Sequence, residues 1–155
     1  MQMSDLFAQL QNSRLFRLKA VAEGLSELVL VDFQGTEGLS QLFEFHLRLA
    51  SQDPNIELKQ MIGQPVTISL ELNSAFASSE QRHFHGYVTH FSHLDTDGGL
   101  ATYSATVRPW IWMLSRRQDI RIFQEQTAQS IISNVFQCYG SLASYEFRLS
   151  KATPN

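Results

Sequence analysis

The chain has 155 residues, of which 43% are hydrophobic and 17% are charged, with a formal net charge of −3. This length corresponds to about one domain, and the hydrophobic content excludes an intrinsically disordered chain. Because basic residues do not outnumber acidic ones, the composition argues against binding to nucleic acid or anionic lipid. The single cysteine, Cys138, excludes an internal disulfide.

The sequence predicts neither a membrane-spanning segment nor a cleavable signal peptide. No apolar run approaches the ~18–20 residues that a transmembrane helix needs. The first residues lack a basic head followed by an apolar stretch. We therefore expect the chain to be made in a cytoplasm and to leave it only by a route that does not read such a signal.

The first half of the chain is predicted to be rich in strands. Residues 1–13 are polar and predict a loose arm or short helix, and alternation then predicts strands over 16–20, 28–31 and 43–49. The second of these is apolar throughout and is expected to be buried on both faces, and Gly35 and Gly38 predict a loop after it. The third strand places its apolar residues on one face and its polar residues on the other: Phe43, Phe45, Leu47 and Leu49, against Glu44, His46 and Arg48.

The middle of the chain predicts one short helix and three more strands. A helix-like spacing over 56–62 ends at Gly63, and strands follow over 66–72, 82–94 and 103–107. Residues 73–81 and 95–99 are predicted to be the loops between these strands. Gly86 lies inside the strand predicted over 82–94, where a glycine often marks a bulge or bend.

Helical patterns replace the alternation after Pro109. An apolar run at 110–114 predicts a helix, and Thr127 is a plausible N-cap of a second one. This second helix is expected to end near Gly140, and a final strand is expected over 145–149. The apolar stripe of the second predicted helix has five members: Ile131, Ile132, Val135, Phe136 and Tyr139.

The order of these elements predicts a mainly β fold with an α+β extension. We expect a flexible arm over 1–13 and a small antiparallel β-barrel over 14–108. Residues 109–155 are expected to start a second α/β segment that is truncated, because its last strand has no nearby partner.

Five histidines suggest a metal site: His46, His83, His85, His90 and His93. His83 and His85 share a strand face, whereas His90 and His93 point to opposite faces of a regular strand. A zinc site needs three or four converging ligands, and neither pair supplies them. A structural role on the polar faces of strands is therefore the favoured interpretation, and no metal or cofactor is assigned.

The other reactive side chains also favour structural interpretations. Cys138 is a conceivable nucleophile, but a position near a helix C-terminus disfavours a thiolate, so a buried or semi-buried cysteine is expected. Asp95 and Asp97 precede two glycines and are interpreted as turn formers, because the remaining ligands of a calcium loop are missing. The motifs G-x-S-x-G, G-x-x-x-x-G-K-[ST] and G-x-G-x-x-G do not occur.

A small basic and aromatic cluster precedes the second predicted helix. Arg116, Arg117 and Arg121 follow Trp110 and Trp112, a combination that can bind single-stranded nucleic acid. The net charge argues against this, so a subunit contact or a solvated face is favoured. No catalytic residues are assigned.

Six segments in order resemble the VgrG family, the trimeric spike proteins of the bacterial type VI secretion system. They span roughly residues 14–150 and are the strand 42–49 (FEF-x-L), residues 58–68 (L-x-x-x-x-G-x-x-V-T), residues 82–88 (R-x-F-x-G-x-V), residues 103–114 (Y-x-x-x-x-x-P-x-x-W-x-L), residues 117–124 (R-x-D-x-R-I-F-Q) and residues 131–147. The chain ends before the family's Q-Y-x-E-S/T-D segment and before any needle repeat.

The resemblance implies a fold like that of a phage tail hub. It further implies a homotrimer in the full-length protein, docking on the Hcp tube protein, and contact with effector or adaptor proteins. A PAAR tip protein would be bound only through the missing C-terminal part. The chain would be assembled in the bacterial cytoplasm and exported through the type VI machinery.

Three functions follow from the sequence. The first is a structural, non-enzymatic hub, for which Glu44, His46 and Arg48 are candidate contact residues. The second is the corresponding hub of a contractile phage, and the residues do not separate these two machines. The third is a metal-dependent hydrolase that uses His83, His85 and another histidine.

Overall fold

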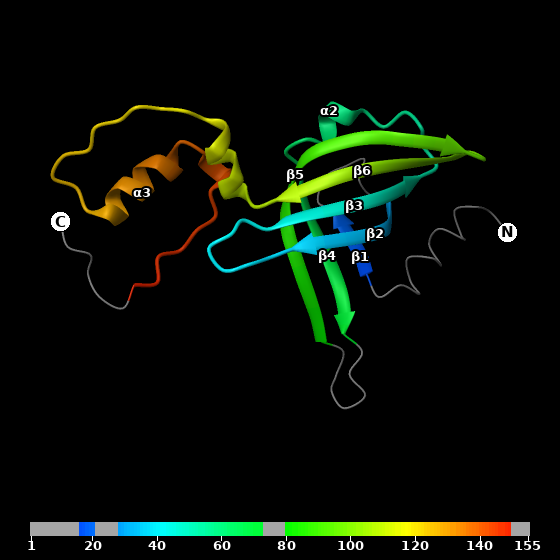
Figure 1. Cartoon of the computed structure of the whole chain (residues 1–155), viewed down its shortest axis with the longest axis horizontal. Coiled ribbons are helices and arrows are strands. Elements are labelled where there is room, and N and C mark those ends of the chain that lie inside the picture. The colour runs from blue at the N-terminus through cyan, green and yellow to red at the C-terminus, as the bar shows by residue number, and fades with distance from the viewer. Residues whose placement is uncertain (1–15, 21–27, 73–79, 150–155) are drawn as a thin grey trace. The chain divides into compact units, whose positions relative to one another are not determined.

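A computed structural model describes residues 16–20, 28–72 and 80–149 (Figure 1). The predicted arm at 1–13 and most of the predicted loop at 73–81 lie outside these residues. The chain divides into two compact units, Met1–Pro109 and Trp110–Asn155. Along the described chain, none of the helices is long and apolar enough to cross a membrane.

Six strands form one antiparallel sheet in the described part of the first unit. They are β1 (Phe16–Ala20), β2 (Val29–Thr36), β3 (Glu44–Ser51), β4 (Pro65–Leu72), β5 (Glu80–Asp97) and β6 (Leu100–Arg108). Their order across the sheet is β1-β4-β5-β6-β3-β2. The two edge strands, β1 and β2, come close to each other, so the sheet curls into a half-barrel (Figure 1). This confirms the predicted mainly β, hub-like fold.

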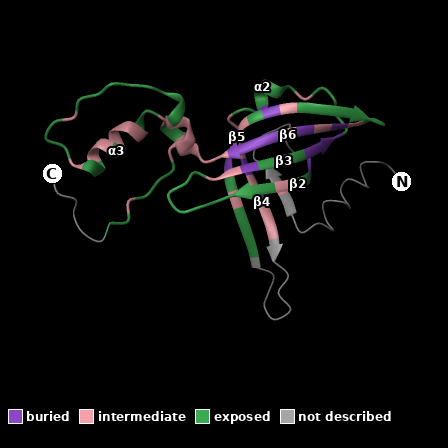
Figure 2. Ribbon diagram, in the orientation of Figure 1, coloured by how far each residue is buried: buried purple, intermediate pink, exposed green. Residues whose placement is uncertain are grey.

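The core of the first unit lies on one face of the strands, as the alternation predicted. Phe45, Leu47 and Leu49 of β3 are buried, and so are Tyr103 and Val107 of β6. Figure 2 shows buried positions concentrated on the strands of this unit. The burial of alternate apolar side chains removes them from water, and this is the main force that holds the sheet in its register.

Two strand boundaries and the burial of one strand differ from the prediction. β2 continues through Gly35 to Thr36, because Gly35 pairs with Phe45, and the turn begins only near Gly38. The same strand is not buried on both faces throughout, since Val31 is 45% exposed. β5 runs to Asp97, so the tight turn consists of Gly98 and Gly99, both with positive φ.

Gly86 is needed for a reason other than the predicted bulge. It pairs regularly with Val66, and the register shifts in β5 occur later, after Val88 and after His93. A Cβ atom at Gly86 would lie 2.7 Å from a methyl group of Val107 and 2.8 Å from the carbonyl oxygen of Arg108. The close approach of β6 therefore requires a residue without a side chain.

The connection between β3 and β4 contains a short helix, α2 (Leu58–Met61), in place of the longer predicted one. Ser51 is fully buried at the end of β3, and its Oγ accepts a hydrogen bond from the Asp53 amide at 3.0 Å. The Tyr103 hydroxyl donates to the Asp53 carbonyl oxygen at 2.8 Å. These bonds hold the start of the loop against the sheet.

The described part of the second unit, residues 110–149, contains three short helices: η1 (Trp110–Arg116), α3 (Ala128–Gln137) and η2 (Gly140–Leu142). Thr127 is the N-cap of α3, as predicted, and its side chain accepts a hydrogen bond from the Ser130 amide at 3.2 Å. The first predicted helix is a 3-10 helix, a form common in short segments. Residues 143–149 form no strand, because no neighbouring strand in the described chain pairs with them.

Candidate functional site

Two histidines lie next to each other on the exposed face of β5. His83 and His85 are two residues apart, and the strand register places Ser69 and Thr67 of β4 opposite them. The Nδ1 atom of each ring lies 2.9 Å from the hydroxyl oxygen opposite it. Two cross-strand hydrogen bonds therefore orient the two imidazoles in the same way.

His90 and His93 lie on opposite faces of β5, as predicted. They pair with Thr106 and Tyr103 of β6, which are an odd number of residues apart. The ring of His93 contacts the ring of Tyr103, and its Nε2 atom lies 2.8 Å from the Thr96 hydroxyl. Both interactions are structural.

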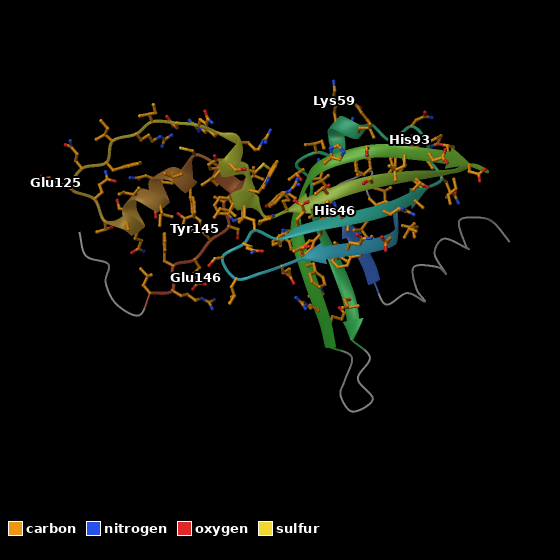
Figure 3. The ribbon with its side chains drawn as sticks, in the orientation of Figure 1. His46, Lys59, His93, Glu125, Tyr145 and Glu146 are labelled. Carbon is orange, nitrogen blue, oxygen red and sulfur yellow. The ribbon has the colours of Figure 1, made fainter. Side chains whose placement is uncertain are left out.

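His46 lies on β3, away from His93 along the sheet (Figure 3). Within the described ranges, no three His, Cys, Asp or Glu side chains are grouped so that they could hold a metal ion. A catalytic zinc site uses three protein ligands. The described histidines therefore do not assemble the site that a metal-dependent hydrolase would need.

A polar network crosses three strands at the end of the sheet. The Nε and Nη2 atoms of Arg108 donate to Glu44 Oε2 at 2.7 and 2.6 Å, and its Nη1 atom donates to the Thr89 hydroxyl at 2.8 Å. The other oxygen of Glu44 lies 2.9 Å from His46 Nε2. Two of the three candidate contact residues, Glu44 and His46, are thus engaged within the sheet, while Arg48 is exposed. A contact role for the three stays a prediction.

In the second unit, Asp119 binds two arginines. Its Oδ2 atom accepts hydrogen bonds from Arg121 Nε at 2.7 Å and Arg117 Nη2 at 3.5 Å. The hydrogen bond from Arg121 is the main cause that lowers the pKa of Asp119 below its usual value. The contacts of Arg121 with Cys138 and then with Asp119 raise the pKa of its guanidinium. Asp119 therefore stays ionised and holds the segment 117–121 together.

Cys138 is exposed, which corrects the predicted buried or semi-buried position. It is the C-cap of α3, and its Sγ atom lies 3.6 Å from the Nη atoms of Arg121 and 3.7 Å from the Asn134 carbonyl oxygen. With Arg121 and Asp119 it lines a pocket of about 270 Å³. None of these contacts supplies a base that could take the thiol proton, so they do not make a nucleophile–base pair.

The predicted basic cluster is divided by its contacts. The guanidinium of Arg116 lies over the ring of Trp112, at 5.5 Å, whereas Arg117 and Arg121 share the single carboxylate of Asp119. The three arginines therefore do not form one uncompensated basic patch. Asp95 lies in β5 and pairs with Thr102, which corrects its interpretation as a turn former. Its carboxylate accepts a hydrogen bond from the Thr96 amide at 2.8 Å.

Sequence reasoning missed the partners of these side chains. The spacing R-x-D-x-R at 117–121 places alternate side chains on one side of an extended chain, so the Asp119 contacts could have been anticipated. The pairs Arg108–Glu44 and His83–Ser69 join residues 64 and 14 positions apart. The members of each pair are brought together by the strand register, which cannot be read from the local sequence pattern.

The sequence profile of the phage tail baseplate hub (GPD) family matches residues 36–155. The chain is 42% identical over 117 residues to the type VI secretion system spike protein VgrG1a of Pseudomonas aeruginosa, which covers 76% of this chain and 18% of that protein. It is 37% identical to VgrG1b of the same organism, over 92% of this chain and 18% of that protein. The chain thus spans about a fifth of the length of these curated relatives.

A solved structure has a similar fold. It is that of the E. coli c3393 protein, described as a component of the type VI secretion system with structural similarity to the T4 bacteriophage tail proteins gp27 and gp5. The similarity has a TM-score of 0.65 at 26% sequence identity, and it covers 81% of this chain and 32% of that one.

Proposed function

The chain belongs to the phage tail baseplate hub (GPD) family, and we propose that it is a structural segment of a type VI secretion spike. In this role it self-associates, as a trimer in the full-length protein, and docks on the Hcp tube protein. It thereby supports the delivery of effectors and catalyses no reaction itself. It is assembled in the bacterial cytoplasm and exported by the machinery without a signal peptide, and a PAAR tip is bound elsewhere in the full-length protein.

The observation that carries this proposal is the incompletely covered second unit. None of the described residues 110–149 is fully buried (Figure 2). Ile120 and Ile122 are 97% and 83% exposed, on an extended segment whose residues 118–126 make no backbone–backbone hydrogen bond within the described chain. Apolar side chains beside an unpaired backbone favour association with another polypeptide.

A hub of a contractile phage particle is the second candidate. The family is defined on a phage baseplate protein, and the similar solved structure is itself described as resembling bacteriophage tail proteins. Both candidates use the same kind of docking surface, and they differ only in the tube protein that is bound.

The proposal is tested by measuring the mass of the chain by sedimentation, alone and with purified Hcp. We expect self-association or a complex with Hcp, and we expect the double variant Ile120→Asp, Ile122→Asp to weaken it. Leu39→Asp is the matched control, because Leu39 is 98% exposed in the first unit, outside this segment. A monomer that does not bind Hcp would contradict the proposal, and binding only to a phage tube protein would favour the second candidate.

A further inference from the structure

We propose that His83 and His85 form a two-histidine chelating site for a divalent transition cation such as Zn²⁺, Ni²⁺ or Cu²⁺. Imidazole nitrogen suits these ions, whereas Mg²⁺ and Ca²⁺ prefer oxygen ligands. The site is separate from the proposed hub role, and it differs from the hydrolase considered above because it needs no third protein ligand.

The spacing of the two histidines suits chelation. Side chains two residues apart on a strand point to the same face, and their Cα atoms are about 7 Å apart. Two imidazoles that lean toward each other can each bring a nitrogen to ~2.0–2.1 Å from one ion between them. Both side chains are exposed, so there is room for this small movement, which shifts the His85 ring at its edge contact with Tyr87, 5.9 Å between ring centroids.

The hydroxyl groups opposite the histidines supply the outer contacts that a metal-binding histidine needs. An ion at Nε2 requires the proton of the neutral ring to be on Nδ1, where a hydrogen bond acceptor fixes it. Thr67 Oγ1 lies 2.9 Å from His85 Nδ1, and Ser69 Oγ lies 2.9 Å from His83 Nδ1. In the described part of the chain, no hydrogen bond occupies either Nε2 atom, so both are available to an ion.

The position of the pair on the sheet leaves the other coordination positions open. β6 pairs with β5 only from Tyr87 onward, so the part of β5 that contains the two histidines pairs with β4 alone (Figure 1). Arg82, the nearest cation in the sequence, points to the opposite face, where it binds Glu37. Water can therefore complete the coordination shell.

The test is calorimetric titration of the whole chain with Zn²⁺ and, separately, with Ni²⁺. We expect one site, and we expect His83→Gln and His85→Gln each to weaken binding at least about tenfold, because each variant leaves a single imidazole. His90→Gln is the matched control, since His90 is exposed on the same strand and has no histidine two residues away along it. Metal binding by this variant should be unchanged. The absence of a site, or an equal effect of all three substitutions, would overturn the proposal.

A second variant tests the outer contacts without touching a ligand. Replacing Thr67 with Val and Ser69 with Ala removes both hydroxyls, and the new side chains are similar in size to the original ones. Binding should fall by about 10–100-fold, as is usual when outer-shell hydrogen bonds of a metal site are lost. Unchanged binding in this double variant would show that the cross-strand hydroxyls do not prepare the site.

Discussion

Arg108, the last residue of β6, binds Glu44, the first residue of β3, with two guanidinium nitrogens on one carboxylate oxygen. The two residues are 64 positions apart, and their contact fastens the end of the sheet just before the chain enters the second unit. The Arg108 side chain is 21% exposed and the Glu44 side chain is 39% exposed, so the pair is partly shielded from water. This position distinguishes it from an ordinary surface ion pair.

We expect Arg108→Lys to lower the free energy of unfolding of the first unit by about 1–2 kcal/mol. A lysine keeps the charge but cannot donate to Glu44 and Thr89 at the same time, and bonds to charged groups contribute about 1.5–3 kcal/mol. Urea denaturation measures the loss. Arg148→Lys is the control, because its pair with Glu146 is exposed and should contribute less than ~1 kcal/mol. Equal effects of the two substitutions would contradict this account.

Gly86→Ala should destabilise the first unit by about 1–3 kcal/mol, since the new methyl group would overlap Val107 and the backbone of Arg108. The backbone oxygen cannot move aside without a shift of β6. Thermal and urea unfolding measure the effect. Gly98→Asn is the matched control, because its turn position is open and asparagine tolerates positive φ. If the alanine variant is as stable as the original chain, the close approach does not constrain this position.

Thr127→Ala should destabilise α3 by about 1 kcal/mol, the usual effect of losing an N-cap. The substitution leaves the Ser130 amide without its acceptor. Amide hydrogen exchange in residues 128–137 measures the local opening of this helix. Ser130→Ala keeps the cap and should have little effect, so faster exchange in both variants would point to a different cause.

The Asp119 carboxyl should titrate below the usual aspartate value of ~3.9, because Arg121 holds its pKa down. A carboxyl whose pKa is lower in the folded state stabilises the fold above its unfolded pKa. That stabilisation is lost as the pH falls through the folded value. Carboxyl chemical shifts followed by NMR during acidification measure this pKa, and Arg121→Gln should raise it toward the usual value. An unchanged titration would show that the hydrogen bond does not persist in solution.

Local patterns in the sequence were sufficient to predict most of the elements. Period-two alternation located the strands, because the burial of one face is already visible in the order of apolar and polar residues. The N-cap at Thr127 depends only on its own side chain and the next three residues, so it was also predictable. The strand expected at 145–149 was wrong in the described chain, since a strand needs a partner as well as an alternating pattern.

The contacts of the candidate site residues could not be predicted, because the local sequence pattern does not show which residues lie opposite one another in the sheet. The sequence showed that His83 and His85 share a face, but it did not show Ser69 and Thr67 opposite their rings. It identified Glu44 and His46 as polar and outward-facing, but not as partners of Arg108 in one network. The sequence placed Cys138 near a helix end, as the structure does, but the predicted burial of its side chain was wrong. Burial depends on whether another segment of the chain covers the side chain, and the local pattern does not contain this information.

The amino-acid sequence by itself determined the mainly β architecture, the change of texture at Pro109 and the resemblance to spike proteins. These properties rest on short-range periodicity and on residue types, which require no knowledge of distant contacts. Only the tertiary structure decided which strands are neighbours, why Gly86 must lack a side chain, and which hydroxyls face the two histidines. Those relationships arise from the pairing of strands far apart in the chain, and the free energy that selects one register belongs to the whole sheet.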